Sequence, residues 1–379
     1  MTTSPSLTTP MTEHLAKVIT QSEGWIGFDV FMAEALYAPG LGYYANDLPK
    51  FGAMPTTHGD TAVKSDFVTA PEMTPLFAHA FARQIAQALE HTQTNEIWEF
   101  GAGTGALAQQ LLTALAAMDV KIRRYTIVDI SSTLKDRQRT RLIDHLNVVE
   151  WVDALPDSIN GVLIGNEVLD AMPVQLLSRV GGVWHERGVA LDTSNPHEES
   201  PPFVWQDRAS DLRPPFEVTG EHDYVTEIHQ QAQGFVQTLA DRLKTGAVFL
   251  LDYGFPESEY YHPQRHMGTV MCHQAHQSDT DPLTQVGQKD ITAHVNFTGI
   301  ALAAQDAGLE VLGYTNQAHF LMNCGIVELM QAASLPERVA AQKLILEHEM
   351  GELFKVIALG TGVPWTPLGF VKGDKMHCL

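Results

Sequence analysis

The hydrophobic pattern of the chain changes near Glu96. Before this residue, apolar positions recur with helical spacing in three segments: Met11–Ser22, Gly27–Tyr37 and Thr74–His91. A Gly/Pro-rich stretch that runs to Lys64 separates the second segment from the third. From Glu96 on, short β-rich runs alternate with helical periods, which is typical of a parallel sheet with crossover helices. The pattern predicts a helical N-terminal lobe over residues 1–92 and an α/β core over residues 93–379.

Five apolar runs of strand length mark the core: Glu96–Phe100, Tyr125–Ile130, Val148–Val152, Val162–Asn166 and Ala247–Asp252. Helices predicted over Ala106–Met118 and Ser132–His145 separate the first three runs, as in half of a doubly wound sheet.

An insertion at about 175–235 is predicted between the fourth and fifth strands. Its first part, Gln175–Leu191, reads as a hairpin that turns at Gly181-Gly182, and a polar, Pro-rich loop is predicted over Asn195–Pro215. Further elements are predicted downstream: helix Ile291–Ala307, strand Leu309–Thr315, helices through Glu352, and a last strand Phe354–Leu359.

Charge limits the partners. The chain of 379 residues has 45 acidic and 24 basic side chains, and its formal net charge of −21 opposes nucleic-acid binding, which needs clustered Lys and Arg. An acidic surface instead attracts cationic partners, although it also simply keeps a protein in solution.

The three cysteines form no C-x-x-C pair, the N-terminus lacks a signal or transit pattern, and no apolar run could span a membrane. These features predict a bacterial cytoplasmic protein, and they determine no oligomeric state.

A glycine-rich motif follows the first core strand. It reads Glu99-Phe100-Gly101-Ala102-Gly103-Thr104-Gly105 and precedes an amphipathic helix, which is where a Rossmann-like sheet receives its ligand. Its spacing is G-x-G-x-G, because Ala106 stands in the place of the third dehydrogenase glycine. The Glu99 carboxylate would repel a pyrophosphate but suits S-adenosylmethionine, whose ammonium and sulfonium are cationic. The motif therefore predicts a methyl donor as cofactor; alternatively, the glycines form only a tight strand-to-helix turn.

Two acids follow the next strands. Asp129 ends the second strand, 28 positions after Gly101, where such folds place the carboxylate that binds the ribose hydroxyls. It could also serve as the N-cap of the following helix. Asp153, after the third strand, is a candidate for the adenine amino group.

The fourth strand ends in three polar residues that we expect to contact the substrate: Asn166, Glu167 and Asp170. Methyl transfer needs an aligned acceptor and a carboxylate that orients it and takes its proton, and Glu167 and Asp170 could pair with a guanidinium. Asn166 and Asp170 could alternatively cap a turn. Asp252-Tyr253-Gly254 ends the fifth strand, and the sequence assigns this segment no role. One run of the chain contains four residues of the types that bind zinc: His266, Cys272, His273 and His276. They lack the paired spacing of zinc sites, so we predict no metal.

These segments together resemble the MidA family of methyltransferases, which includes the mitochondrial complex I assembly factor that symmetrically dimethylates an arginine. The resemblance runs from about Ile26 to Phe370. The motifs that carry it are Ile26-Gly27-Phe28 through Phe31-Met32, Gly42-Tyr43-Tyr44, Asp66-Phe67-Val68-Thr69-Ala70-Pro71-Glu72, the glycine motif, Asn166-Glu167 with Leu169 to Val174, Asp252-Tyr253-Gly254, Gly268-Thr269 with His276, and Asp290 to Val295. Three positions depart from the family pattern: Ser65, Asp129 and Asn296.

The resemblance implies a class I methyltransferase core with a helical N-terminal lobe, S-adenosylmethionine as cofactor, and symmetric methylation of a protein arginine, such as one in a respiratory quinone-reductase subunit. Pro71 and Glu72 would then open a helix at the cofactor pocket. His294, on a helix that starts near Asp290, is a candidate proton acceptor or a structural histidine.

Other functions stay open. A small molecule could be the methyl acceptor, and an assembly or scaffold protein could bind S-adenosylmethionine with little turnover. A nicotinamide dehydrogenase is disfavoured by the G-x-G-x-G spacing and by Glu99.

Overall fold

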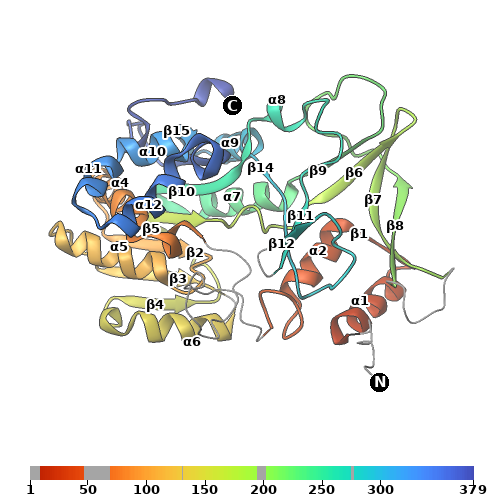
Figure 1. The fold of residues 1–379 in the computed structure, drawn as a ribbon, viewed down its shortest axis with the longest axis horizontal. Helices are drawn as coiled ribbons and strands as arrows, with labels where there is room; N and C mark the ends of the chain where they lie inside the picture. The colour runs from red at the N-terminus through yellow and green to blue at the C-terminus, as the bar shows by residue number, and fades with distance from the viewer. Residues whose placement is uncertain (1–8, 47–68, 130, 194–201, 275–276) are drawn as a thin grey trace. The chain divides into compact units, whose positions relative to one another are not determined.

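The computed structural model describes residues 9–46, 69–129, 131–193, 202–274 and 277–379 (Figure 1). The contacts divide the chain into two compact units. Unit 1 comprises Met1–Leu48, Ala171–Ala232 and Glu257–His294, and unit 2 comprises Pro49–Asp170, Gln233–Pro256 and Val295–Leu379. The contacts group residues 75–92 with the sheet of unit 2, and the division at residue 92 stays a prediction.

Unit 2 contains an eight-stranded sheet among its described residues: β2 (Glu96–Phe100), β3 (Arg124–Val128), β4 (Val149–Val152), β5 (Ile159–Asn166), β10 (Leu243–Phe255), β14 (Val295–Asn296), β15 (Glu310–Asn316) and β16 (Phe354–Gly360). The strand order is β15-β16-β10-β5-β2-β3-β4, and β14 pairs with the end of β10. Strands β4, β3, β2, β5 and β10 run parallel to one another, whereas β16 is antiparallel to both β10 and β15. The doubly wound α/β sheet predicted from the sequence is confirmed.

Helices cover this sheet (Figure 1). They are α3 (Ala70–Met73), α4 (Pro75–Thr92), α5 (Ala106–Ala117), α6 (Ser132–Arg141), α7 (Gln230–Arg242), α9 (Phe297–Asp306), α10 (Gln317–Asn323), α11 (Ile326–Ala332) and α12 (Leu335–Ile345). On one face, Phe81 of α4 packs edge-on against Phe249 of β10, and Leu111 of α5 belongs to the same buried cluster. On the other face, Phe235 of α7 meets Phe100 of β2. Because both faces are covered, the strands are apolar on both sides, as their continuous hydrophobic runs predicted.

The described residues of unit 1 form two smaller sheets. The first has the order β1-β7-β6-β9, with β8 paired to β7. Its strands are β1 (Trp25–Gly27), β6 (Gln175–Val180), β7 (Val183–Leu191), β8 (Phe203–Ala209) and β9 (Tyr224–Ile228). The second has the order β12-β11-β13, from β11 (Met271–Gln274), β12 (Gln277–Asp279) and β13 (Asp290–Thr292). Helices α1 (Pro10–Gln21) and α2 (Phe28–Tyr37) pack their apolar faces into the core of this unit, and α8 (Glu257–Tyr260) is a single turn.

Two sequence-based predictions of secondary structure are wrong. The polar loop expected over Asn195–Pro215 contains β8, because Phe203 to Ala209 pair with His185 to Leu191 of β7. The helix expected over Ile291–Ala307 begins only at Phe297, because Asp290–Thr292 pair with β11 and Val295–Asn296 pair with β10. Asn296 caps this helix by accepting a hydrogen bond from Gly299 N at 3.1 Å.

Across the described residues, no helix combines the length and the apolarity that a membrane crossing requires.

Candidate active site

The glycine motif forms the turn between β2 and α5. Gly101, Gly103 and Gly105 all have positive φ, at 63°, 51° and 83°, a conformation that costs other residues energy. A Cβ on Gly101 would lie 2.8 Å from the Val168 side chain, so the loop also packs tightly against the turn that follows β5. The Gly105 N–H donates to Ala102 O at 2.8 Å and closes the turn before α5 begins. The loop is thus shaped to bring its backbone close to a ligand.

Glu99 lies beside this loop but inside the protein. Its side chain is buried and accepts a hydrogen bond from Tyr125 OH at 2.8 Å. Burial raises the pKa of Glu99 to about 8, against the lowering effect of the Tyr125 hydrogen bond and with a further raising effect from the nearby Asp129 charge. Glu99 therefore adds a titratable negative charge beneath the loop, and its predicted contact with the cofactor stays a prediction.

Asp129 follows β3 at the same edge of the sheet. Its Oδ1 accepts a hydrogen bond from Ser131 N at 2.8 Å, and its Oδ2 accepts one from the Gln138 side chain, also at 2.8 Å. The N-cap of α6 is Ser131, whose hydroxyl accepts from Leu134 N, so the capping role considered for Asp129 belongs to its neighbour. Asp129 is partly exposed, which leaves it accessible to a ribose.

Pro71 and Glu72 belong to the short helix α3, separate from α4. The Glu72 carboxylate forms an ion pair with Arg141 of α6 at 2.8 Å and accepts a hydrogen bond from Thr104 of the glycine loop. The Arg141 guanidinium also donates to the Thr104 hydroxyl. Glu72 thus contacts the loop through its side chain, as its predicted place near the cofactor requires.

Asp153 follows β4 and is exposed, and its carboxylate pairs with Lys135 of α6. Nothing in this arrangement tests its predicted contact with the adenine.

The three residues predicted to contact the substrate lie in one turn at the end of β5. Asn166 Nδ2 donates to the Glu167 carboxylate at 2.8 Å, while its buried Oδ1 accepts no hydrogen bond from the described part of the chain. Glu167 has a φ of 57°, an uncommon conformation for a residue other than Gly or Asn. Its N–H donates to Leu251 O of β10 at 2.9 Å and holds the turn in place. A strained backbone that carries an acidic side chain at a sheet edge is typical of functional sites.

Asp252 supports this turn, a role that the sequence did not reveal. Its Oδ2 accepts hydrogen bonds from the N–H groups of Val168, Leu169 and Asp170, at 3.0, 2.8 and 3.3 Å. The capping that we considered for Asp170 is thus performed by Asp252. Asp170 instead accepts a hydrogen bond from Tyr253 OH. The only sequence signal for this role is the acid at the end of the neighbouring strand.

Negative charge is concentrated here. Burial is the main cause that raises the pKa of Glu167, to about 8, and the Asp170 charge raises it further. Burial, followed by the charges of Asp170 and Glu167, also raises the pKa of Asp252. Three carboxyl groups that disfavour one another's ionisation would each be stabilised by a bound cation.

His294 belongs to unit 1. It is in the connection between β13 and β14 rather than on a helix, and its N–H donates to Thr269 Oγ1 at 3.1 Å. The predicted helical position is wrong because the flanking residues pair as strands. Its role as a proton acceptor stays a prediction.

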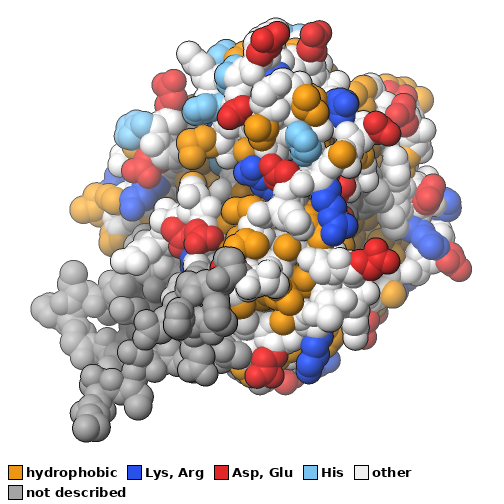
Figure 2. Space-filling model, turned by 90° about the vertical axis from the view of Figure 1, so that its right-hand side faces the viewer, with side chains coloured by type: hydrophobic (Ala, Val, Ile, Leu, Met, Phe, Trp, Pro, Cys, Tyr) orange, Lys and Arg blue, Asp and Glu red, His pale blue; other side chains and the backbone are white. Residues whose placement is uncertain are grey.

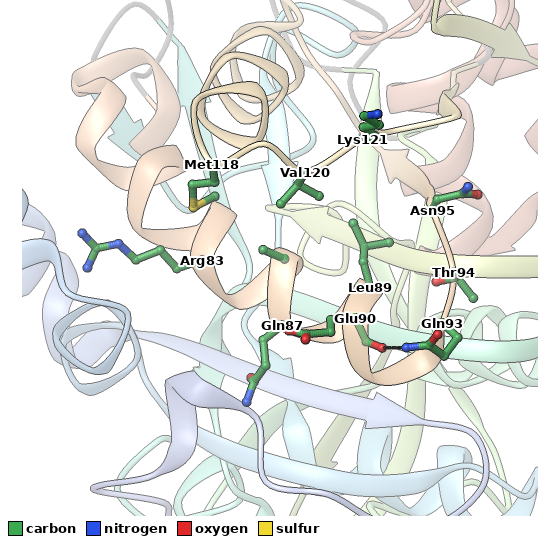
Figure 3. A pocket seen from close by; sticks show the side chains of 11 residues that line it. Arg83, Gln87, Leu89, Glu90, Gln93, Thr94, Asn95, Met118, Val120 and Lys121 are labelled. Carbon is green, nitrogen blue, oxygen red and sulfur yellow. Dashed lines mark hydrogen bonds between the residues drawn. The ribbon is translucent and has the colours of Figure 1, made fainter.

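Two other features do not add to the site. An open groove of about 680 Å³ lies at the opposite edge of the sheet, between the end of α4 and the segment before β3, where Leu89 and Val120 meet polar residues such as Gln93 (Figure 3). It contains none of the predicted site residues. His276 lies outside the described residues, and among those described no group of His, Cys, Asp and Glu is arranged to hold a metal ion.

The buried carboxyl groups predict how stability depends on pH. With a folded-state pKa of about 8 against an ordinary value of 4.5, Glu99 keeps its proton in the folded protein while the unfolded chain has lost it. The free energy of unfolding should therefore fall as pH rises from about 4.5 to about 8. Glu99→Gln should flatten this dependence in urea titrations at several pH values, whereas the exposed Glu90→Gln should not. An unchanged slope in Glu99→Gln would contradict the burial of this charge.

Comparison with known proteins agrees with this arrangement. Residues 80–315 match the profile of a family of S-adenosyl-L-methionine-dependent methyltransferases. A crystal structure of a Burkholderia thailandensis protein bound to S-adenosyl-homocysteine is 45% identical, with a TM-score of 0.90 over 97% of this chain and 96% of that one.

More distant relatives are described by a more specific activity, the methylation of protein arginine. The mitochondrial protein arginine methyltransferase NDUFAF7 homolog of Caenorhabditis elegans is 26% identical over 92% of this chain and 86% of its own length. The NDUFAF7 protein of Xenopus laevis is 26% identical over 89% and 82%. With the profile covering more than half of its length, the chain belongs to this family of S-adenosyl-L-methionine-dependent methyltransferases, as its resemblance to the MidA family led us to expect.

Proposed function

We propose that this methyltransferase transfers methyl groups to an arginine of a protein substrate. The observation that carries the proposal is the group of three carboxyl side chains, Glu167, Asp170 and Asp252, at the adjoining ends of β5 and β10. A guanidinium is a planar cation that binds carboxylates through two parallel hydrogen bonds. It would offset both the burial and the neighbouring negative charges that raise the pKa of Glu167 and Asp252.

Within unit 2, the glycine loop lies next to the turn that carries Glu167 and Asp170. Val168 lies in the turn between Glu167 and Asp170, and its side chain touches Gly101. The charges near the loop are suited to S-adenosylmethionine: Asp129 is acidic, the buried Glu99 ionises more readily beside a bound cation, and the described cations Arg141 and Lys135 are both paired with acids. A pyrophosphate would meet repulsion here, whereas a sulfonium and an ammonium would not.

S-adenosylmethionine supplies an electrophilic methyl group, so the protein has to place a nitrogen in line with it and accept a proton. We propose that Asp170, fixed by Tyr253, orients the guanidinium, and that the Asn166 Oδ1 accepts one of its N–H groups. As the bond from nitrogen to methyl forms and the bond from sulfur to methyl breaks, Glu167 takes the proton that the nitrogen loses. S-adenosyl-homocysteine is the leaving group.

The net charge of −21 is not gathered into one acidic patch on the face that Figure 2 shows. Acidic side chains on that face are scattered among Lys, Arg, His and apolar side chains. The proposal therefore rests on the three carboxyl groups themselves and not on a broad acidic field over this face.

We further propose a bacterial cytoplasmic location and, from the resemblance, symmetric dimethylation of an arginine in a respiratory quinone-reductase subunit. The free state of Cys272, Cys324 and Cys378 supports a reducing compartment.

A transfer assay tests the proposal. Extract from cells that lack the protein is incubated with methyl-labelled S-adenosylmethionine and purified protein, and label is counted separately in the protein and small-molecule fractions. We expect label in one or a few protein bands. Label confined to small molecules would support a small-molecule acceptor instead, and cofactor binding without any transfer would support a scaffold.

A further inference from the structure

Helix α6 is attached to the rest of unit 2 in an unusual way. Its sequence, STLKDRQRTR, is almost entirely polar, so it has little apolar surface to bury against the sheet. Among its described side chains, Gln138 is fully buried. A Cβ on Gly105 would lie 3.5 Å from Gln138 Cα, so the helix backbone approaches the glycine loop closely at this residue.

The Gln138 amide makes three hydrogen bonds. Its Nε2 donates to Gly103 O at 2.9 Å and to Asp129 Oδ2 at 2.8 Å, and its Oε1 accepts from Trp151 Nε1 at 2.8 Å. The partners fix the orientation of the amide. A carbonyl oxygen and a carboxylate can only accept, and an indole N–H can only donate, so a flipped amide would lose all three bonds.

Two of these partners are groups expected to meet the cofactor: the backbone of the glycine loop and the ribose-binding acid Asp129. We propose that Gln138 is a positioning residue for cofactor binding, which sets the Gly103 carbonyl and the Asp129 carboxylate in one fixed relative geometry. The proposal rests on the cofactor contacts assigned above to the glycine loop and Asp129. Trp151 of β4 is its support, because the indole holds the amide in the orientation that both contacts need.

The test compares two buried helix glutamines. Gln138→Met keeps the length of the side chain and removes all three hydrogen bonds. Gln84→Met is the matched control, since Gln84 is equally buried in α4 and its amide binds Gly369 N at 2.7 Å, far along the chain from the loop. Both variants should melt at lower temperature. Calorimetric titration with S-adenosyl-homocysteine should show a Kd raised about 10-fold or more for Gln138→Met and unchanged within error for Gln84→Met.

A second ligand separates positioning from general loosening. Wild-type protein should bind S-adenosyl-homocysteine more tightly than its 2′-deoxyribose analogue, because Asp129 accepts from the ribose. This preference should shrink in Gln138→Met, and Asp129→Asn should add little further loss in the double variant. If Gln138→Met fails to fold, Trp151→Phe removes the indole donor together with part of the ring, leaves Gln138 in place, and should still raise the Kd severalfold.

The outcomes distinguish a failure of the proposed cofactor site from a failure of the positioning role of Gln138. If the wild type does not bind S-adenosyl-homocysteine, the proposed site itself is overturned and the role of Gln138 with it. If the wild type binds and Asp129→Asn weakens binding, but Gln138→Met and Trp151→Phe leave both the Kd and the ribose preference unchanged, the positioning role alone is overturned.

Discussion

Gly103→Arg should abolish measurable binding of S-adenosylmethionine and S-adenosyl-homocysteine. Gly103 has a φ of 51° in the turn that faces the proposed ligand, and its carbonyl is held by Gln138. An arginine there would adopt an unfavourable backbone conformation, and its long side chain would fill the space of either ligand. Its charge would in addition repel the sulfonium of S-adenosylmethionine. Calorimetric titration should show an affinity reduced by at least about 100-fold, which corresponds to about 2.7 kcal/mol of binding free energy.

Gly181→Arg provides the matched control for backbone strain. Gly181 has a nearly equal φ of 57° in the β6–β7 turn, where an added Cβ would meet nothing within 4 Å. Its substitution should lower the melting temperature without changing cofactor affinity. Retained binding in Gly103→Arg, with a melting temperature like that of Gly181→Arg, would show that the cofactor does not use this loop.

Glu167→Gln should reduce methyl transfer by about 100-fold or more, because a positioned proton acceptor contributes 100-fold to 10,000-fold to a rate. The amide keeps the size of the side chain and cannot take the proton. Since Glu167 lies in the turn after β5 rather than in the loop after β2, the affinity for S-adenosyl-homocysteine should stay within about threefold of wild type. Initial rates at saturating S-adenosylmethionine, together with calorimetry, measure both quantities.

Two further variants sharpen this test. Glu186→Gln is the control: it removes a half-buried carboxyl group of unit 1, whose pKa is also raised by burial. This substitution should leave methyl transfer unchanged. Glu167→Gly should inactivate the enzyme yet raise its melting temperature, because glycine relieves the positive φ and removes a buried acid. Full activity in Glu167→Gln would assign proton acceptance elsewhere, with His294 the first candidate.

The pH profile of the same reaction has a defined sign. With the pKa of Glu167 at about 8 in the free protein, kcat/KM should rise with pH and level off above about 8. The rise should vanish from the residual activity of Glu167→Gln. A rate that falls over this interval would contradict a carboxylate acceptor.

The sequence predicted those parts of the fold that local pattern determines. The boundaries of β2 and the start of α5 were read correctly because an apolar run, three glycines and a helical period follow one another. The strand β8 was missed because its apolar start, Phe203 to Trp205, is short and stands between a Pro-rich segment and polar residues, so that its pairing with β7 marks it more clearly than its own sequence. The helix start at Phe297 was misplaced because Ile291 and Val295 are spaced as on a helix, while distant strands compete for them.

The same limit applies to the site. Asn166, Glu167 and Asp170 could be predicted as candidate site residues because they follow a strand at the edge where α/β sites lie, and their contact with the substrate stays a prediction. The roles of Asp252 and Gln138 depend on side chains that meet across separate elements, at Leu169 N and at Trp151. One glutamine among the polar residues of α6 carries no pattern of its own, so only the three-dimensional contacts reveal it.

The most direct test of the proposed activity is the identity of the methylated atom. Protein labelled by the purified enzyme should be hydrolysed in acid and the labelled amino acid identified by chromatography and mass spectrometry. The acidic edge formed by Glu167, Asp170 and Asp252 predicts methylarginine, with both methyl groups on different nitrogens if the product is symmetric. Label in methyllysine, or label lost in base as a carboxyl methyl ester, would contradict a guanidinium acceptor at this site.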